Sequence, residues 1–122
     1  MRSHKDLDVW KRSVDLVTII YSLTKGFPKE EIYGLTNQIR RAAVSIPSNI
    51  SEGAGRNHSR EFIQFLFISL GSVSELETQI IISENLKYLL SEDSIKIQSE
   101  LSELRKMILG LIRSLGERVT SN

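Results

Sequence analysis

Hydrophobic side chains recur along this chain at intervals of three and four residues, which is the spacing of an amphipathic α-helix. The repeat runs through four stretches, which cover residues 6–25, 35–50, 59–89 and 91–115. None of these stretches shows the alternation of apolar and polar residues that is typical of a strand. The pattern therefore predicts four helices, of which the third and fourth are the longest.

Residues that end and begin helices stand between the four stretches. Gly26 and Pro28 follow the first stretch, and Gly53 and Gly55 end the second. The residues expected to cap the third and fourth helices are Asn57 or Ser59, and Ser91. Because the connections are short, each helix runs back along its predecessor. We expect an all-α protein with the architecture of an up-down-up-down antiparallel four-helix bundle.

Length and composition narrow the class of protein. With 122 residues, the chain fits one domain, so residues 1–122 are expected to form a single four-helix-bundle domain with short frayed termini. The absence of cysteine excludes disulfides, thiolate catalysis and cysteine-type zinc sites, and it suits a reducing cytosol. The N-terminus lacks a signal-peptide core, and no apolar run approaches the roughly 20 residues of a membrane span. We expect a soluble, cytoplasmic protein with no membrane partner.

The charges are segregated along the chain, although the formal net charge is only +1. Residues 1–60 hold ten Lys/Arg against six Asp/Glu, residues 61–104 hold two against eight, and residues 105–122 hold four against one. Two interpretations stay open. The oppositely charged stretches attract each other, within one bundle or between subunits, or the basic stretches form a functional face.

The chain lacks the residues for the metal and catalytic centres that helical bundles carry. A di-iron carboxylate site needs Glu-x-x-His pairs, and the only histidines, His4 and His58, do not follow a glutamate at that spacing. The sequence EGAGR neither follows a strand nor ends in the Lys-Ser/Thr of a phosphate-binding P-loop. Glu75 and Glu77 point in different directions from a helix, so they make a poor acid–base pair. We expect no metal, no cofactor and no enzymatic activity.

A glutamate and an asparagine nevertheless lie near the predicted core. Glu77 stands beside the apolar seam of the third helix, and Asn49 stands beside that of the second. A buried or flanking carboxylate needs a partner. We predict a structural polar network in which Glu77, or Glu75, accepts a hydrogen bond from Asn49, from an early residue of the third helix or from an arginine.

Residues 45–60, SIPSNISEGAGRNHSR, contain the residues that are least suited to a helix. Pro47 lacks an amide hydrogen and crowds the carbonyl of Ala43, so we expect it to kink or locally open the second helix. Gly53 and Gly55 then allow backbone geometries that other residues avoid. The segment is therefore either a structural joint or a working surface.

A basic turn follows the joint. Arg56, His58 and Arg60 lie at the start of the third helix, where free amides and the helix dipole favour an anion. Together these groups can hold a phosphate. The alternative is that the two arginines only pair with Glu52 or Glu61.

Three runs of this sequence resemble a known family. The runs RRAAVSIPSNISEGAGR (residues 40–56), the pair Phe65 and Leu66, and GSVSELETQ (residues 71–79) closely resemble the four helix bundle proteins first noticed as open reading frames in intervening sequences of bacterial 23S rRNA genes. These are often labelled S23 ribosomal proteins. The resemblance extends from DLDVWKRSVDLV through the fourth helix. Its motif positions here are Arg40, Arg41, Pro47, Asn49, Glu52, Gly53, Gly55, Arg56, Gly71, Glu75 and Glu77.

The resemblance implies a four-helix bundle that assembles as a ring-shaped homopentamer. It also implies kinship with the accessory bundle protein of diversity-generating retroelements, which associates with a reverse transcriptase and nucleic acid. It implies no established enzymatic activity. The ribosomal label reflects where the genes were found and does not place the product on a ribosome.

We infer a non-enzymatic, homo-oligomeric bundle that binds RNA or another nucleic acid through a basic surface. The residues expected to form it are Arg40, Arg41, Arg56, Arg60, Lys11 and Arg12. Oligomerisation would let several weak phosphate contacts act together. Against this function stand the low net charge and the shortage of aromatic residues interleaved with the basic ones.

Two other functions are weighed against nucleic-acid binding. One is a protein-interaction or scaffold module, in which the acidic third helix meets the basic first or second helix of a neighbour and the exposed surface binds a protein partner. The other is a hydrolase that uses Glu77, Asn49 and Arg56. A structure in which these three side chains pair with one another and are closed to solvent would rule out the hydrolase.

Overall fold

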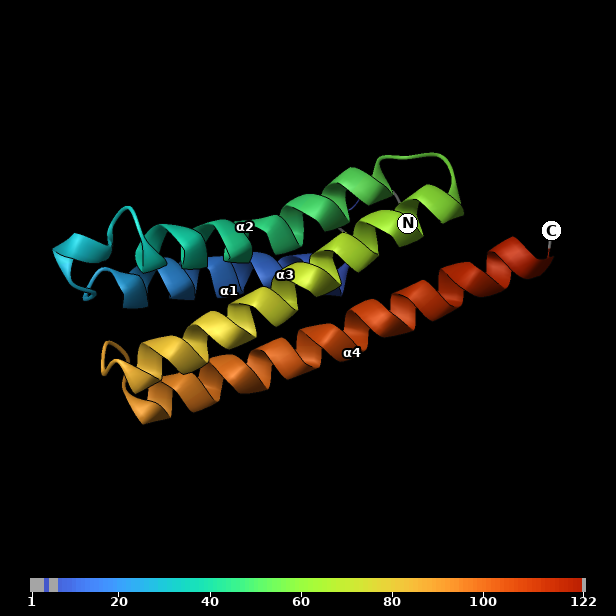
Figure 1. The fold of residues 1–122 in the computed structure, drawn as a ribbon. Helices are drawn as coiled ribbons and strands as arrows, with labels where there is room; N and C mark the ends of the chain where they lie inside the picture. Colours follow the sequence, from blue (N-terminus) through green and yellow to red (C-terminus); the bar gives the residue numbers. More distant parts are fainter. Residues whose placement is uncertain (1–3, 5–6, 122) are drawn as a thin grey trace.

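The computed structural model describes residue 4 and residues 7–121 of the chain. Within them, the chain forms α1 (Asp8–Thr24), a short 3-10 helix η2 (Lys29–Glu31), α2 (Leu35–Ala54), α3 (Ser59–Asn85) and α4 (Ser91–Ser121). Each α-helix packs against the next along the chain, and α4 also contacts α1 (Figure 1). The all-α, up-down four-helix architecture predicted from the hydrophobic pattern is confirmed.

Helices α2, α3 and α4 each bury the stripe of residues that their hydrophobic repeat defines. Helix α1 differs, because it buries Ser13 and Thr24 and leaves the apolar repeat positions Val14 and Tyr21 outside the core. In α4, the residues Ile97, Leu101, Leu104 and Ile108 follow one another in steps of four and three, and all are at most 3% exposed. Fully burying each such side chain is worth about 1.5–3 kcal/mol. The same repeat in α3 buries Leu66, Val73, Leu76 and Ile80. These seams form the core that holds the helices together.

The contact between α2 and α3 is the most extensive between any two of the described helices, and small residues lie within it. A Cβ atom placed on Gly53 would lie only 2.8 Å from the Phe62 and Phe65 side chains of α3. The hydroxyl of Ser69 donates a hydrogen bond of 2.9 Å to the carbonyl oxygen of Ile46. The Ser72 hydroxyl likewise donates to the Ser45 hydroxyl, at 2.8 Å. The small residues of this part of the sequence therefore allow α2 and α3 to approach each other closely.

Pro47 does not interrupt α2, which runs through it from Leu35 to Ala54. The sequence predicted a kink or a local opening at this point. Pro47, Ala43 and Ile46 are all buried, and Ser69 of α3 binds the carbonyl of Ile46. Packing against α3 therefore keeps the helix continuous despite the backbone hydrogen bond that proline cannot make.

The helix ends differ from the predicted ones in three places. His58 occupies the cap position of α3 and makes no side-chain cap bond, so neither Asn57 nor Ser59 caps this helix. Ser91 is already helical, since the Ser94 amide donates to the carbonyl of Leu90. The third helix ends at Asn85 instead of Leu89, because Lys87 adopts a left-handed conformation with φ 64°. Local helix propensity does not determine where these helices begin and end, because their ends depend on where the neighbouring helices lie.

Helix α3 is apolar around much of its circumference. By length and composition alone, Ser59–Asn85 is a candidate membrane span, contrary to the expectation that no segment approaches one. In the bundle, however, this helix packs against both α2 and α4 and supplies part of the core. Its mixed buried and exposed apolar residues are those of a core helix that also presents a hydrophobic outer face.

Candidate nucleic-acid interface

The six basic residues expected to bind nucleic acid lie in three separate places. Lys11 and Arg12 are on α1, Arg40 and Arg41 are in the first half of α2, and Arg56 and Arg60 flank the turn between α2 and α3. Sixteen helical residues span roughly 24 Å, which is about the separation of the α2 pair from the turn. One monomer therefore does not gather the six side chains into a single patch.

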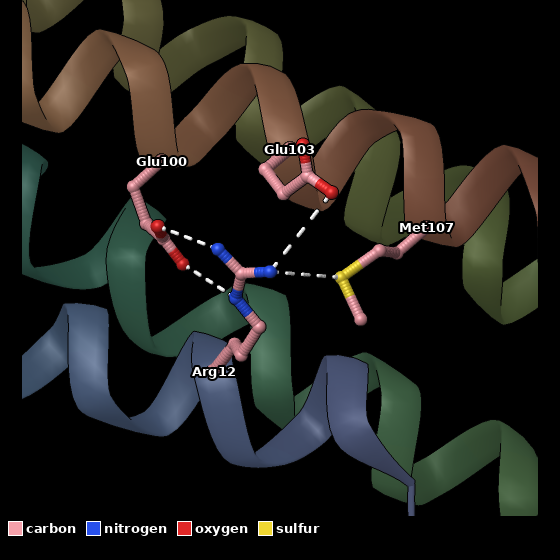
Figure 2. Close-up of polar contacts among 4 residues, drawn as sticks. All are labelled: Arg12, Glu100, Glu103 and Met107. Carbon is pink, nitrogen blue, oxygen red and sulfur yellow. Dashed lines mark hydrogen bonds and ion pairs between the residues drawn. The ribbon is translucent and has the colours of Figure 1, made fainter.

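Arg12 is engaged inside the bundle. Its Nε and Nη2 atoms both donate to the carboxylate of Glu100 at 2.9 Å, and Nη1 lies 3.9 Å from a Glu103 oxygen (Figure 2). Nη1 also lies 3.8 Å from the sulfur of Met107. The hydrogen bond with Glu100 raises the pKa of the Arg12 guanidinium, with the charges of Glu100 and Glu103 acting in the same direction. Arg12 thus joins α1 to α4, and its guanidinium is already paired with two carboxylates.

The two arginines of α2 occupy different surroundings. Arg40 donates from Nε to the Thr24 hydroxyl at 2.9 Å, and its guanidinium lies 4.6 Å from the ring centre of Tyr21. Arg41 is exposed and lines a polar hollow together with Tyr33, which is 94% exposed. Tyr33 is therefore an exposed aromatic ring beside a cation, a combination whose scarcity in the sequence argued against nucleic-acid binding.

The basic turn contains both an ion pair and an exposed cation. Arg56 donates to Glu52 at 3.0 Å, four residues earlier on α2, and packs 5.2 Å from the ring centre of Phe65. Both partners of this ion pair are about half exposed, so the pair is worth little and competes poorly with an incoming phosphate. Arg60 is exposed and lines a surface hollow with Glu61. The pairing of Arg56 with Glu52 was one of the predicted alternatives.

The end of α4 contributes a residue that sequence reasoning missed. A hollow of 370 Å³ at the turn is lined by Arg56, His58 and Ser59 and also by Arg118, which lies near the C-terminal end of α4. A second hollow of 550 Å³ adjoins the same turn and includes Arg60. The net positive charge of residues 105–122 was the available signal, because an up-down bundle returns the end of the fourth helix to this side.

The predicted polar network forms at Glu77 but does not include Asn49. Glu77 accepts a hydrogen bond from Arg105 of α4, and an arginine was one of the expected donors. Asn49 instead donates to the Ser45 backbone and hydroxyl within α2, at 2.8 and 2.9 Å. Glu75 lines the hollow of Arg41 and is exposed. Asn49 therefore does not reach Glu77, because the i to i−4 bond on its own helix satisfies its amide.

The groups of the suggested hydrolase are not brought together. Glu77 is held by Arg105, Asn49 by Ser45 and Arg56 by Glu52, in three separate contacts. Among the described residues, no group of three histidine, cysteine, aspartate or glutamate side chains is placed to hold a metal ion. In the described part of the chain, these three side chains therefore do not form the shared site that the suggested hydrolase requires.

The chain is similar to proteins of one family. The family model described as 23S rRNA-intervening sequence protein matches residues 5–110. A crystal structure of a protein of unknown function from the S23 ribosomal protein family of Bacteroides thetaiotaomicron VPI-5482 is 25% identical, with a TM-score of 0.79. The similarity covers 85% of this chain and 97% of that one. No curated protein matches the chain.

Proposed function

This chain belongs to the 23S rRNA-intervening sequence protein family, and we propose that it is a non-enzymatic, homo-oligomeric bundle that binds RNA or another nucleic acid. The proposed surface surrounds the turn between α2 and α3. The observation that carries the proposal is the start of α3, where the helix has no side-chain cap and Arg56, Arg60 and Arg118 line the adjacent hollows. Free amides and positive charge at one helix end favour phosphate oxygens.

Assembly would make this modest surface effective. Arg56 is partly neutralised by Glu52, so a single copy offers few phosphate contacts. Several copies on one strand of RNA raise the effective concentration of each later contact. The exposed apolar residues of α3 supply a surface for such assembly, since Phe67, Ile68, Ile81 and Ile82 are each at least 41% exposed.

The test is a titration of labelled structured RNA, single-stranded RNA and duplex DNA with nuclease-treated protein, followed by fluorescence anisotropy. Binding is expected to weaken steeply between roughly 50 and 200 mM salt. The double substitution Arg56→Ala and Arg60→Ala is expected to weaken it at least about tenfold and to lower the salt slope by about two. The matched control is Lys96→Ala with Lys106→Ala, which removes the same charge from exposed positions on α4.

A protein-interaction module is the second candidate, and the apolar outer face of α3 favours it. In that case the basic turn contributes to contacts between protein surfaces. The two functions differ in what the arginine substitutions change. Loss of RNA binding with intact assembly supports the nucleic-acid surface. Loss of assembly, or no binding to any of the three nucleic acids at micromolar protein, contradicts it and favours the scaffold.

A further inference from the structure

A small cavity lies where α1 leads into α2, at the end of the bundle away from the basic turn. Its volume is 240 Å³, below the roughly 300–1,000 Å³ of pockets that hold drug-sized ligands. Its walls include the buried residues Thr24, Phe27 and Thr36. The cavity therefore fits a small polar group better than a whole nucleotide.

Three cations line this cavity: Lys25, Lys29 and Arg40. Of the described residues, no carboxylate is among those that line it. Glu31 is close in sequence, but its Oε2 accepts from the Tyr88 hydroxyl at 3.0 Å and its Oε1 from the Leu35 amide at 3.2 Å. The cavity thus concentrates positive charge. Of the two carboxylates that follow Lys29 in η2, Glu30 does not line the cavity and Glu31 is already engaged.

Arg40 is held in place for a ligand. Its Nε donates to the Thr24 hydroxyl, which itself donates to the Ile20 carbonyl at 2.8 Å, and the guanidinium rests on the Tyr21 ring. Within the described part of the chain, Arg40 forms no ion pair with a carboxylate. The two terminal nitrogens remain, and their planar fork matches the spacing of two oxygens of an oxyanion.

A buried hydroxyl in the same cavity lacks a partner. Thr36 is 4% exposed, and its Oγ1 makes no hydrogen bond in the structure. Buried polar groups are almost always hydrogen-bonded, so an unpaired hydroxyl is unusual and can donate to a bound oxygen. Thr36 also belongs to the first turn of the 20-residue helix α2, whose positive end favours an anion. Charge, an oriented guanidinium and an unsatisfied donor therefore meet in one small space.

We propose that this cavity binds a phosphate group, with Arg40 gripping two of its oxygens, Lys25 and Lys29 neutralising its charge and Thr36 donating a hydrogen bond. The site is independent of the surface proposed around the turn, because it shares no residue with that surface. The phosphate belongs either to a free anion or to the end of an oligonucleotide. The two sources share this chemistry and differ in what else contacts the protein.

Isothermal titration calorimetry with inorganic phosphate, at constant ionic strength, tests the site. Phosphate is expected to bind and to raise the midpoint of thermal unfolding, whereas sodium chloride at the same ionic strength is not. Lys25→Gln with Lys29→Gln is expected to weaken phosphate binding at least about tenfold. Both lysines are exposed, so the variant should fold normally. The control, Lys96→Gln with Lys106→Gln, removes equal charge from α4 and should bind as the wild type does.

A second variant addresses the buried donor. Thr36→Val keeps the shape of the side chain and removes the hydroxyl, so it is expected to weaken phosphate binding without lowering the unfolding midpoint of the free protein. No binding at about 10 mM phosphate, or equal binding by the wild type and the Lys25/Lys29 variant, would overturn the proposal.

Three further titrants distinguish a free phosphate anion from the end of an oligonucleotide. These are a trinucleotide with a 5′-phosphate, the same trinucleotide without it, and a nucleoside monophosphate. Preference for the phosphorylated trinucleotide over all others assigns the site to oligonucleotide ends. Equal affinity for inorganic phosphate, the nucleoside monophosphate and the 5′-phosphorylated trinucleotide assigns it to a free phosphate anion. Equal affinity for both trinucleotides, which differ only in the terminal phosphate, contradicts the site. The variant with Arg56→Ala and Arg60→Ala should retain phosphate binding. The cavity can therefore be confirmed even where the surface around the turn does not bind nucleic acid.

Discussion

The two glycines at motif positions 53 and 71 are expected to respond in opposite ways to the same substitution. In Gly53→Ala, the new Cβ would lie 2.8 Å from Phe62 and Phe65 and 3.2 Å from the Phe62 carbonyl. Overpacking of this kind costs about 1–3 kcal/mol. Gly71 has no neighbouring atom within 4 Å, so Gly71→Ala should stabilise α3 by about 0.5–1 kcal/mol through its helix propensity. Urea unfolding of the two variants beside the wild type measures both effects.

The pair also serves as its own control. Both substitutions add one methyl group at a helical glycine, so a general effect of alanine would move both midpoints in one direction. Equal stability of Gly53→Ala and the wild type would mean that α2 and α3 separate at this point without cost. That result would contradict the close approach of the two helices.

For single charged residues, the sequence could predict the need for a partner but not the identity of that partner. The sequence indicated that Glu77 needs a partner, and that an arginine could supply it. It could not name Arg105, because the facing residue depends on the rotation of α4 relative to α3. Arg12 illustrates the same limit, since its partner Glu100 lies 88 positions away in the sequence. A residue expected on a ligand surface therefore became a link between two helices.

At the scale of elements, Tyr88 links the two connections at one end of the bundle and should make stability depend on pH. Its hydroxyl donates to Glu31 of η2 at 3.0 Å, and its ring packs 5.5 Å from that of Phe27. The hydrogen bond to Glu31 raises the pKa of Tyr88 above its ordinary value of 10.0, with burial and the charge of Glu31 adding to the effect. The folded chain therefore prefers the protonated tyrosine.

The sign of the pH effect follows from that preference. A group whose pKa is raised by folding contributes stability below its unfolded pKa and loses it as the pH rises through the folded pKa. Between about pH 9 and pH 11, the wild type should therefore lose stability more steeply than Tyr88→Phe. Urea unfolding across this range measures the difference. Parallel losses in both proteins would show that the Tyr88 proton is not linked to folding.

Helix lengths explain why part of the candidate surface escaped prediction. The hydrophobic repeat gave the number and order of the helices, since burial of one face leaves a periodic pattern. It did not give the position of the end of α4 relative to the turn after α2. Arg118 lines a hollow with Arg56 and His58 because α4, at 31 residues, continues back to that turn. Surfaces made by helix ends are set by length and packing, which a local pattern does not contain.

At the scale of the whole molecule, substitutions on the exposed apolar face of α3 test whether the protein assembles through it. Phe67 and Ile81 are 55% and 54% exposed, and their spacing of two heptads places them on one side of the helix. A glutamate at both positions puts charge into any apolar contact made there, which associating surfaces tolerate poorly.

For the proposed homo-oligomer, Phe67→Glu with Ile81→Glu is therefore expected to give a particle of 13.9 kDa in sedimentation equilibrium, with unchanged helical circular dichroism. Ile95→Glu, at a position 66% exposed near the start of α4, is the single-site control and should leave the mass as in the wild type. Because the proposed RNA-binding surface gains from repetition of the basic turn, the same double variant should also bind RNA more weakly despite keeping every arginine. Undiminished assembly would move the interface to another face. A wild type that is monomeric at about 100 μM would contradict the proposal that several turns act together, because each turn would then have to bind RNA alone.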